Sequence, residues 1–124
     1  MKRGSVRRFD AAAEFATSER CRIVEVSNSE DDSDVSIARA CVAPGVVTRW
    51  HRVAGTAERY VILEGTGRVE VGDEVREVVT PGDVVLIPPD CPQRIANIGE
   101  RDLVFLAICT PRFRAEAYSE FDER

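Results

Sequence analysis

The sequence predicts an all-β protein, an antiparallel barrel or sandwich. Short extended runs rich in Val, Ile, Tyr and Phe alternate with Gly, Pro and Asp, a spacing typical of such folds. Only the two ends have helical character, and neither a repeat nor a linker divides the chain. We therefore expect one domain over residues 1–124, with strands at 21–26, 35–42, 46–53, 58–64, 67–71, 74–79, 83–87, 93–97 and 103–109.

Composition limits the function classes. With 124 residues, 44% of them hydrophobic and 31% charged, the chain has the balance of a globular domain. A net charge of −5 argues against nucleic acid as a partner, because phosphate backbones attract basic surfaces. No run reaches the roughly 20 apolar residues of a membrane span, and the N-terminal stretch lacks the apolar core of a signal peptide. We expect a cytoplasmic protein with no membrane partner.

The four cysteines lie far apart and form no CxxC pair. In a reducing compartment such cysteines act as small apolar residues, and a disulfide or a cysteine metal site is the alternative. Cys91, between Asp90 and Pro92 at the expected barrel mouth, would be reactive only as an exposed thiolate.

The first residues, 1–20, are weakly patterned. Asp10 precedes three alanines and is expected to cap one short helical turn, with Phe9 and Phe15 as anchors. The alternating runs 21–26 and 35–42 follow as strands, separated by a polar turn at 27–34. That turn is acidic, yet it lacks the central glycine and final glutamate of a calcium loop, so we expect a solvated loop.

The rest of the chain continues the strand pattern. Gly72 and Asp73 form a two-residue hairpin turn between two of the runs. In the tail, 111–124, Phe113, Ala117 and Tyr118 fall at helical spacing together with Phe121, which predicts a terminal turn of helix packed on the barrel. The barrel itself is expected at about residues 21–110, after an N-terminal segment at 1–20.

Strand alternation groups the candidate site residues. Residues two apart on a strand share a face, so one lumen can receive three faces at once. These faces carry Arg49, His51 and Val53; Glu58, Tyr60 and Ile62; and Gln93, Ile95 and Asn97. Parity therefore permits His51, Glu58 and Gln93 to converge, with the other six residues as pocket walls. An inward glutamate is costly unless it is paired, which favours a site of some kind there.

These residues also carry a resemblance to the cupin superfamily of small β-barrels, and most to its short single-domain bacterial members. Gly45, His51, Glu58 and Gly65 fall on the family's first motif. The second motif is matched by Gly82-Asp83, Pro88 and Asn97, with Asp90 replacing a glycine. The resemblance covers about residues 35–110 and implies a double-stranded β-helix, or jelly-roll, barrel.

The resemblance also implies a metal site, and here the chain departs from the family. Metal-binding cupins typically hold the ion with three histidines and a glutamate. This chain keeps His51 and Glu58, whereas Val53 and Gln93 stand at the other two histidine positions. Val has no donor atom, and a glutamine carbonyl is a neutral, harder donor than imidazole. We expect a weakened site for one divalent metal, Zn, Mn or Fe, at His51, Glu58 and Gln93; if the site is degenerate, no metal binds.

Several functions stay open at this point. The first is a small-molecule-binding cupin that works as a metal-dependent oxygenase, isomerase or lyase. The second is a metal-free enzyme resembling sugar epimerases or cyclases, in which His51 is the general acid or base and Glu58 or Tyr60 tunes it. The third is a non-catalytic module that binds or senses a small ligand. The catalytic candidates are His51, Glu58 and Tyr60.

The expected partners are a small-molecule ligand and a second copy of the chain. Cupins of this size commonly pair. The run 103–108 is apolar on both strand faces, and such a strand needs cover on both sides. One face can fill the barrel, and a homodimer is predicted to cover the other.

Overall fold

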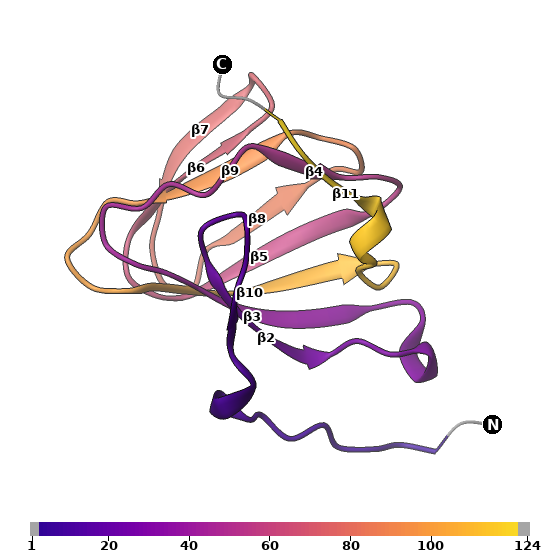
Figure 1. Ribbon diagram of the computed structural model, residues 1–124. Coiled ribbons are helices and arrows are strands. Elements are labelled where there is room, and N and C mark those ends of the chain that lie inside the picture. The colour runs from indigo at the N-terminus through magenta and orange to yellow at the C-terminus, as the bar shows by residue number, and fades with distance from the viewer. Residues whose placement is uncertain (1–2, 122–124) are drawn as a thin grey trace.

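The computed structural model describes residues 3–121, which form two antiparallel sheets facing each other around a common core (Figure 1). One sheet has the order β1-β2-β3-β10-β5-β8 and the other β11-β4-β9-β6-β7. The strands are β1 (Phe15–Ala16), β2 (Arg22–Ser27), β3 (Ser36–Val42), β4 (His51–Val53), β5 (Ala57–Glu64), β6 (Gly67–Val71), β7 (Val75–Val79), β8 (Val84–Ile87), β9 (Gln93–Asn97), β10 (Leu103–Thr110) and β11 (Tyr118–Glu120).

The predicted strands are confirmed almost throughout, since β2, β3 and β5 to β10 all lie within a residue or so of the expected runs. The exception is 46–53, where only His51–Val53 is strand. Before it, the chain runs beside β9 through single contacts, in which Thr48 donates its backbone N–H to Ile95 O at 2.9 Å. The helical turn near Asp10 is present as a 3-10 helix, Ala11–Ala13, capped by the Asp10 carboxylate.

The ends of the chain differ from the prediction. The tail has one 3-10 turn, Ala115–Ala117, but Tyr118 belongs to a strand that pairs with β4 rather than to a helix. Tyr118 adopts strand conformation because β4 would otherwise lie at the sheet edge with unpaired backbone N–H and C=O groups. Phe9 and Phe15 do not anchor the N-terminal segment in the core, since they are 51% and 47% exposed.

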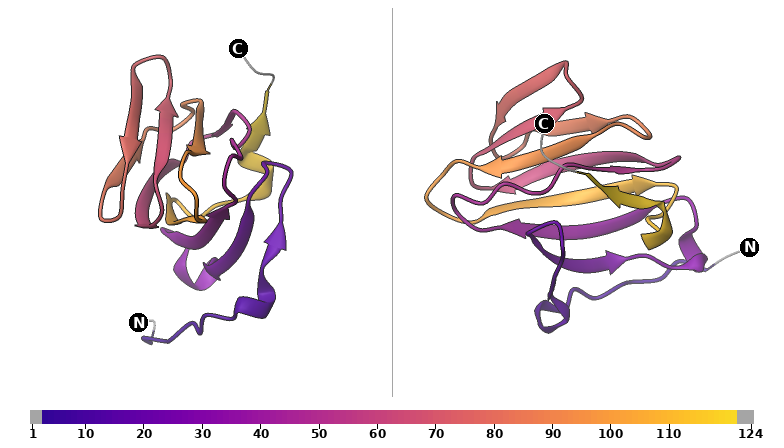
Figure 2. Two further views of the ribbon diagram at one scale, coloured as in Figure 1. Left: turned by 90° about the vertical axis from the view of Figure 1, so that its left-hand side faces the viewer. Right: turned by 45° about the horizontal axis from the view of Figure 1, so that its top comes forward.

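The core follows from alternation on both sheets. Inward residues of β5, β6, β9 and β10 form one apolar cluster that includes Ile62, Val69, Ile95, Leu103 and Phe105, all nearly inaccessible to solvent. Two further views show the two sheets facing each other, and in the left view the N-terminal hairpin and the C-terminal strand lie on the same side (Figure 2). Elements from both chain ends thus cover one mouth of the barrel.

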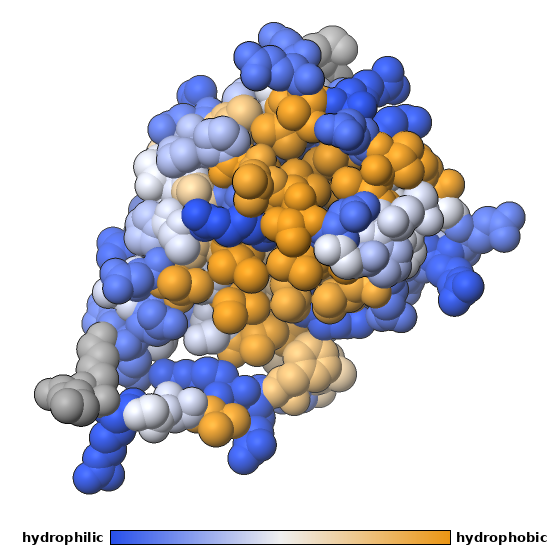
Figure 3. Space-filling view, turned by 180° about the vertical axis from the view of Figure 1, so that it is seen from behind, coloured by the Kyte–Doolittle hydropathy of each residue, from blue (hydrophilic) through white to orange (hydrophobic). Residues whose placement is uncertain are grey.

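The outer surface carries apolar side chains as well. On β10, Val104 is buried while Leu106 is half-buried, and on the neighbouring strands Leu63, Val84 and Leu86 are exposed, Leu86 by 71%. Figure 3 shows apolar side chains gathered across the middle of the face seen from behind. The predicted homodimer stays a prediction, and these residues are where it would be tested.

Two further expectations concern the whole chain. Within residues 3–121 no helix is long and apolar enough to cross a membrane. Cys21, Cys41 and Cys109 are buried thiols, and Cys91 is half-buried. Cytoplasmic location stays a prediction.

Candidate functional site

His51 stands at the covered mouth, at the start of β4, and is 2% exposed. Its Nδ1 lies 2.8 Å from the backbone oxygen of Arg49. A carbonyl oxygen only accepts hydrogen bonds, so Nδ1 carries the hydrogen and Nε2 is left as the basic nitrogen of the neutral ring. The ring stacks on Tyr118 of β11 with centroids 5.3 Å apart. The backbone therefore fixes both the tautomer and the orientation of the only imidazole in the sequence.

Glu58 and Gln93 meet beside it, as strand parity permitted. His51 and Gln93 are partners across the β4–β9 pair, and Gln93 Nε2 donates to the Glu58 carboxylate. The other Glu58 oxygen accepts from the Cys109 thiol, with Sγ 3.7 Å away. Burial raises the pKa of Glu58, and the nearby His51 works against that rise. Burial likewise raises the pKa of Cys109 to about 12, so this thiol stays protonated and donates.

Glu19 also belongs to the site, and sequence reasoning missed it. A tight turn holds it: the Thr17 backbone N–H and hydroxyl both donate to Cys21 O at 3.0 Å, and Arg20 adopts φ +74°. The Glu19 carboxylate then lies 3.5 Å from His51 Nδ1. Burial raises its pKa, while His51 opposes the rise. No strand pattern or motif marks this loop residue, and only a long-range backbone bond to Arg49 N places it.

Glu19, His51 and Glu58 line a small cavity of about 40 Å³, whereas Gln93 and Cys109 are not among its lining residues. Such a volume holds a water molecule or one small ligand group. Of the predicted pocket residues, Val53 and Tyr60 lie on its wall. Burial raises the pKa of Tyr60 far above its usual range, and its ring packs on Phe105 with centroids 4.4 Å apart. Tyr60 therefore acts as a neutral wall here.

The other predicted pocket residues lie elsewhere. Ile62 and Ile95 are 1% exposed members of the core. Asn97 is at the opposite end of the barrel, where its amide donates to Val42 O and Arg101 O at 2.8 Å and holds a turn. Arg49 turns away from the cavity and pairs with Glu120 at 3.0 Å. The predicted lumen thus divides into a packed core and a smaller polar mouth.

The two chain ends are tied together across this mouth. Ser18, next to Glu19, donates to the Glu120 carboxylate at 2.6 Å, and Tyr118 donates to the same oxygen at 2.8 Å. The Ser18 hydrogen bond is the main cause of a lowered pKa for Glu120, with Tyr118 and Arg49 adding to it. We call Ser18, Arg49, Tyr118 and Glu120 the latch, because together they close the cavity from outside.

Asp90 stands where the cupin pattern has glycine. Its φ is +64°, a left-handed conformation that glycine adopts freely and that aspartate tolerates better than most residues. Its carboxylate accepts from Gly55 N at 3.1 Å, which links the turn to the end of β4. The backbone shape of the motif is thus kept although the residue differs.

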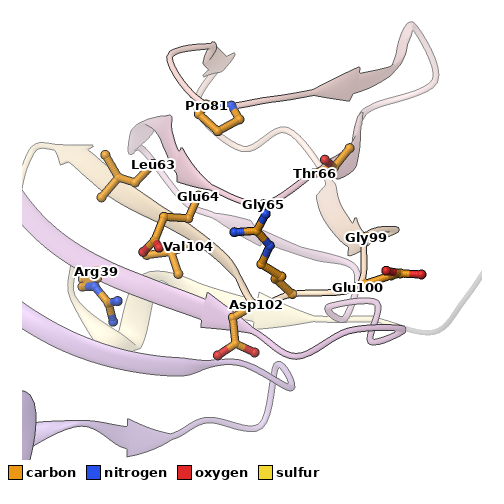
Figure 4. A pocket seen from close by; sticks show the side chains of 11 residues that line it. Arg39, Leu63, Glu64, Gly65, Thr66, Pro81, Gly99, Glu100, Asp102 and Val104 are labelled. Atoms are coloured by element: carbon orange, nitrogen blue, oxygen red, sulfur yellow. The ribbon is translucent and has the colours of Figure 1, made fainter.

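A larger hollow lies away from this mouth. An open groove of about 750 Å³ lies at the other end of the barrel, among the turns that follow β5, β7 and β9 (Figure 4). Arg39, Glu64, Glu100, Arg101 and Asp102 give it mixed charge. No histidine is among the described residues that line it. We therefore place the chemistry at the smaller cavity.

The residues at the mouth are a poor fit to a resident metal. One observation favours a cation: Gln93 Oε1 is fully buried and has no hydrogen-bond partner among the described residues. Against it, Val53 supplies no ligand, and both Glu58 oxygens already accept from protein donors. Within residues 3–121 no group of three or more His, Cys, Asp or Glu side chains is arranged to hold a metal. Protein zinc sites use three or four such ligands.

A model of the cupin domain family matches residues 38–109. Over 81 residues the chain is 38% identical to the uncharacterized protein MJ1618 of Methanocaldococcus jannaschii, covering 65% of this chain and 64% of that protein. It is 32% identical over 98 residues to the glucose-6-phosphate isomerase of Pyrococcus furiosus, covering 69% and 52%. The chain thus spans between about half and two thirds of the length of these relatives.

Solved structures agree on the fold. A conserved protein with a double-stranded β-helix domain from Klebsiella pneumoniae superposes with a TM-score of 0.77 at 13% identity. That match covers 96% of this chain and all of the other. At this identity the likeness concerns the fold alone, and it confirms the predicted jelly-roll barrel.

Proposed function

This chain belongs to the cupin family, and on that premise we propose that it binds a small molecule at the latched mouth of its barrel and transfers a proton on it. One observation carries the proposal. His51, whose Nε2 is the basic nitrogen of the neutral ring, shares a cavity with two carboxylates, the half-buried Glu19 and the buried Glu58. Burying two acids costs free energy, and such groups in a cavity are typical of functional sites.

Each residue has a distinct part in this reaction. His51 Nε2 takes a proton from the carbon next to a carbonyl of the ligand, so that an N–H bond forms as the C–H bond breaks. The electron pair moves to the carbonyl oxygen. The Glu58 carboxylate takes the proton from the hydroxyl on the neighbouring carbon and passes it to this oxygen, so that Glu58 ends as a carboxylate again. His51 then returns its proton to the former carbonyl carbon while the neighbouring carbon becomes the new carbonyl, which completes an isomerisation. Glu19, facing Nδ1, stabilises the imidazolium in between.

The relatives support this reaction class without fixing the substrate. The Pyrococcus relative is called an isomerase of glucose 6-phosphate, and aldose–ketose isomerisation moves hydrogen between adjacent carbons. Cupin relatives often bind metal, and a divalent metal at His51, Glu58 and Gln93 stays a prediction. Because the donor set fits one poorly, we route no step through it.

Solvent deuterium exchange tests the proposal. Hydroxyacetone and aminoacetone, each with five heavy atoms, are incubated with the protein in D₂O, and incorporation beside the carbonyl is followed by NMR. We expect exchange with wild type, loss by at least about tenfold in His51→Gln, and no change in Glu77→Gln, an exposed control on β7. Exchange that disappears on chelation and returns with Zn, Mn or Fe would favour the metal-dependent enzyme.

A non-catalytic binding module is the second candidate. The observation that favours it is the small size of the cavity, about 40 Å³, together with the Ser18–Glu120 hydrogen bond that ties the two chain ends beside it. In that case neither probe exchanges deuterium above background, with or without added metal. The same protein would still bind a ligand, and His51→Gln would change only the affinity.

We further propose a homodimer in which a second copy covers the outer face of β5, β8 and β10. Leu63, Val84 and Leu86 leave this face apolar, and large exposed apolar areas usually mark an interface. Light scattering should give twice the chain mass of 13.8 kDa, and Leu86→Lys should shift it toward the monomer. A monomeric wild type would contradict the proposal.

A further inference from the structure

A second cavity adjoins the first. It has a volume of about 130 Å³ and shares Glu19, Ile23, Glu58 and Phe113 with the smaller one. An apolar protein cavity of roughly 150 Å³ accommodates benzene, so the space suits an organic group of about six heavy atoms. The two shared carboxylates stand where a polar head group in the small cavity would join an apolar body in the larger one.

The lining of both cavities is acidic. Glu19 and Glu58 contribute to each, and Glu25 to the larger. Among the described residues that line them there is no lysine or arginine, and His51 is the one side chain able to carry positive charge. Two arginines close in sequence to lining residues make other contacts: Arg49 pairs with Glu120 at 3.0 Å, and Arg59 donates to Thr110 Oγ1 at 2.6 Å. An anionic ligand would face buried acids without a counter-charge.

Aromatic rings complete the enclosure. Tyr60, Phe105, Phe113 and Tyr118 line the small cavity, and Phe15 joins Phe113 at the larger. Phe113 and Tyr118 meet edge to face with centroids 6.3 Å apart. Aromatic faces attract ammonium groups, and a carboxylate nearby adds an ion pair. The rings also serve packing, but packing alone would have been satisfied by apolar residues in place of the two glutamates.

We infer that the ligand of this site is a small organic cation, a primary amine with a compact apolar body. The inference rests on the proposed function for the location of the site, and it adds the chemical class of the ligand. It also differs from the phosphate named for the isomerase relatives, because among the described residues neither cavity is lined by a lysine or an arginine for a phosphate group.

A matched ligand series tests the charge preference. Butylamine, 1-butanol and butyrate have similar bodies and carry a positive, neutral and negative head at pH 7. Calorimetric titration of wild type should show butylammonium binding at least about tenfold more tightly than butanol, with butyrate weakest. Glu19→Gln and Glu58→Gln should each lower the affinity for butylammonium at least about fivefold while leaving that for butanol within twofold. Glu77→Gln should match wild type.

Three results would overturn the inference: butyrate binding as tightly as butylammonium, equal affinity for all three compounds, or no binding of any. Circular dichroism checks that each variant is folded. If a variant is unfolded, the order of the three ligand affinities measured with wild type decides the question. Failure here is distinct from failure of the proposed function. Deuterium exchange into hydroxyacetone without amine binding would support the proposed reaction and contradict the amine ligand. Amine binding without exchange would support the amine ligand and contradict the reaction.

Discussion

The two ends of this barrel divide structure from chemistry. The open end has a groove of about 750 Å³ with mixed charge, whereas the latched end has a cavity of about 40 Å³ with a histidine, one buried acid and one half-buried acid. At the open end the shape of the turns comes from glycine and from hydrogen bonds between Asn97 and the backbone. At the latched end the side chains themselves are costly to bury. The comparison shows that the free-energy cost of burying polar side chains locates this site better than the volume of a hollow does.

The largest expected effect is at the open end, on stability. Gly65 has φ +85°, and a Cβ there would lie 2.6 Å from the backbone oxygen of Asp102. Gly65→Ala should destabilise the fold by about 4 kcal/mol, from left-handed strain plus overpacking, as measured by urea unfolding. Gly45→Ala is the control, since its φ is +79° but nothing lies within 4 Å. It should cost about 1–2 kcal/mol. Equal losses would mean that the groove end has no special packing.

The next effect sharpens the latched end. Val53→His restores an imidazole on the face of His51, beside a cavity with about 40 Å³ of space. We expect affinity for Zn or Mn to rise at least about tenfold over wild type in a metal titration. His51→Ala should bind less than either. If His51→Ala binds as well as wild type, any metal lies outside this mouth.

A smaller effect concerns Glu19 and pH. Its raised pKa means that the folded state holds the proton more tightly than the unfolded state. The stability it contributes is therefore lost as pH rises from the unfolded pKa through the folded one. Glu19→Gln should raise the unfolding temperature at pH 7 by about 4 °C, or about 1 kcal/mol. The gain should shrink toward pH 4. A loss of stability at pH 7 would show that the pairing with His51 outweighs burial.

The smallest effect is expected at the latch. Ser18→Ala removes one hydrogen bond to Glu120, whose side chain is partly exposed. Unfolding free energy should fall by about 0.5–1 kcal/mol. Ser119→Ala, on an exposed residue of the same strand, should be neutral. If both behave alike, the tie between the chain ends adds nothing to stability.

Much of the fold could be predicted from the sequence, because strand alternation depends on residues that are neighbours along the chain. Alternation places β2, β3 and β5 to β10, and parity permits Glu58 and Gln93 to meet, because the face on which a side chain lies depends only on its position along its own strand. Glu19 could not be predicted, since a loop residue reaches His51 only through the pairing of distant strands. Tyr118 was misassigned because a few apolar residues fit a helix as well as a strand. An unpaired β4 edge, invisible in the sequence, decides between them.

The three-residue ladder between β11 and β4 has a consequence for timing. His51, Arg52 and Val53 are paired on this side only by Tyr118–Glu120. So short a ladder opens far more often than the core strands, without disturbing β5, β9 or β10. Amide hydrogen exchange should therefore be fast along β11 and slow along β10, and a bound ligand should slow the first without touching the second. The pace at which the C-terminal strand lifts would then set how quickly anything enters or leaves the barrel.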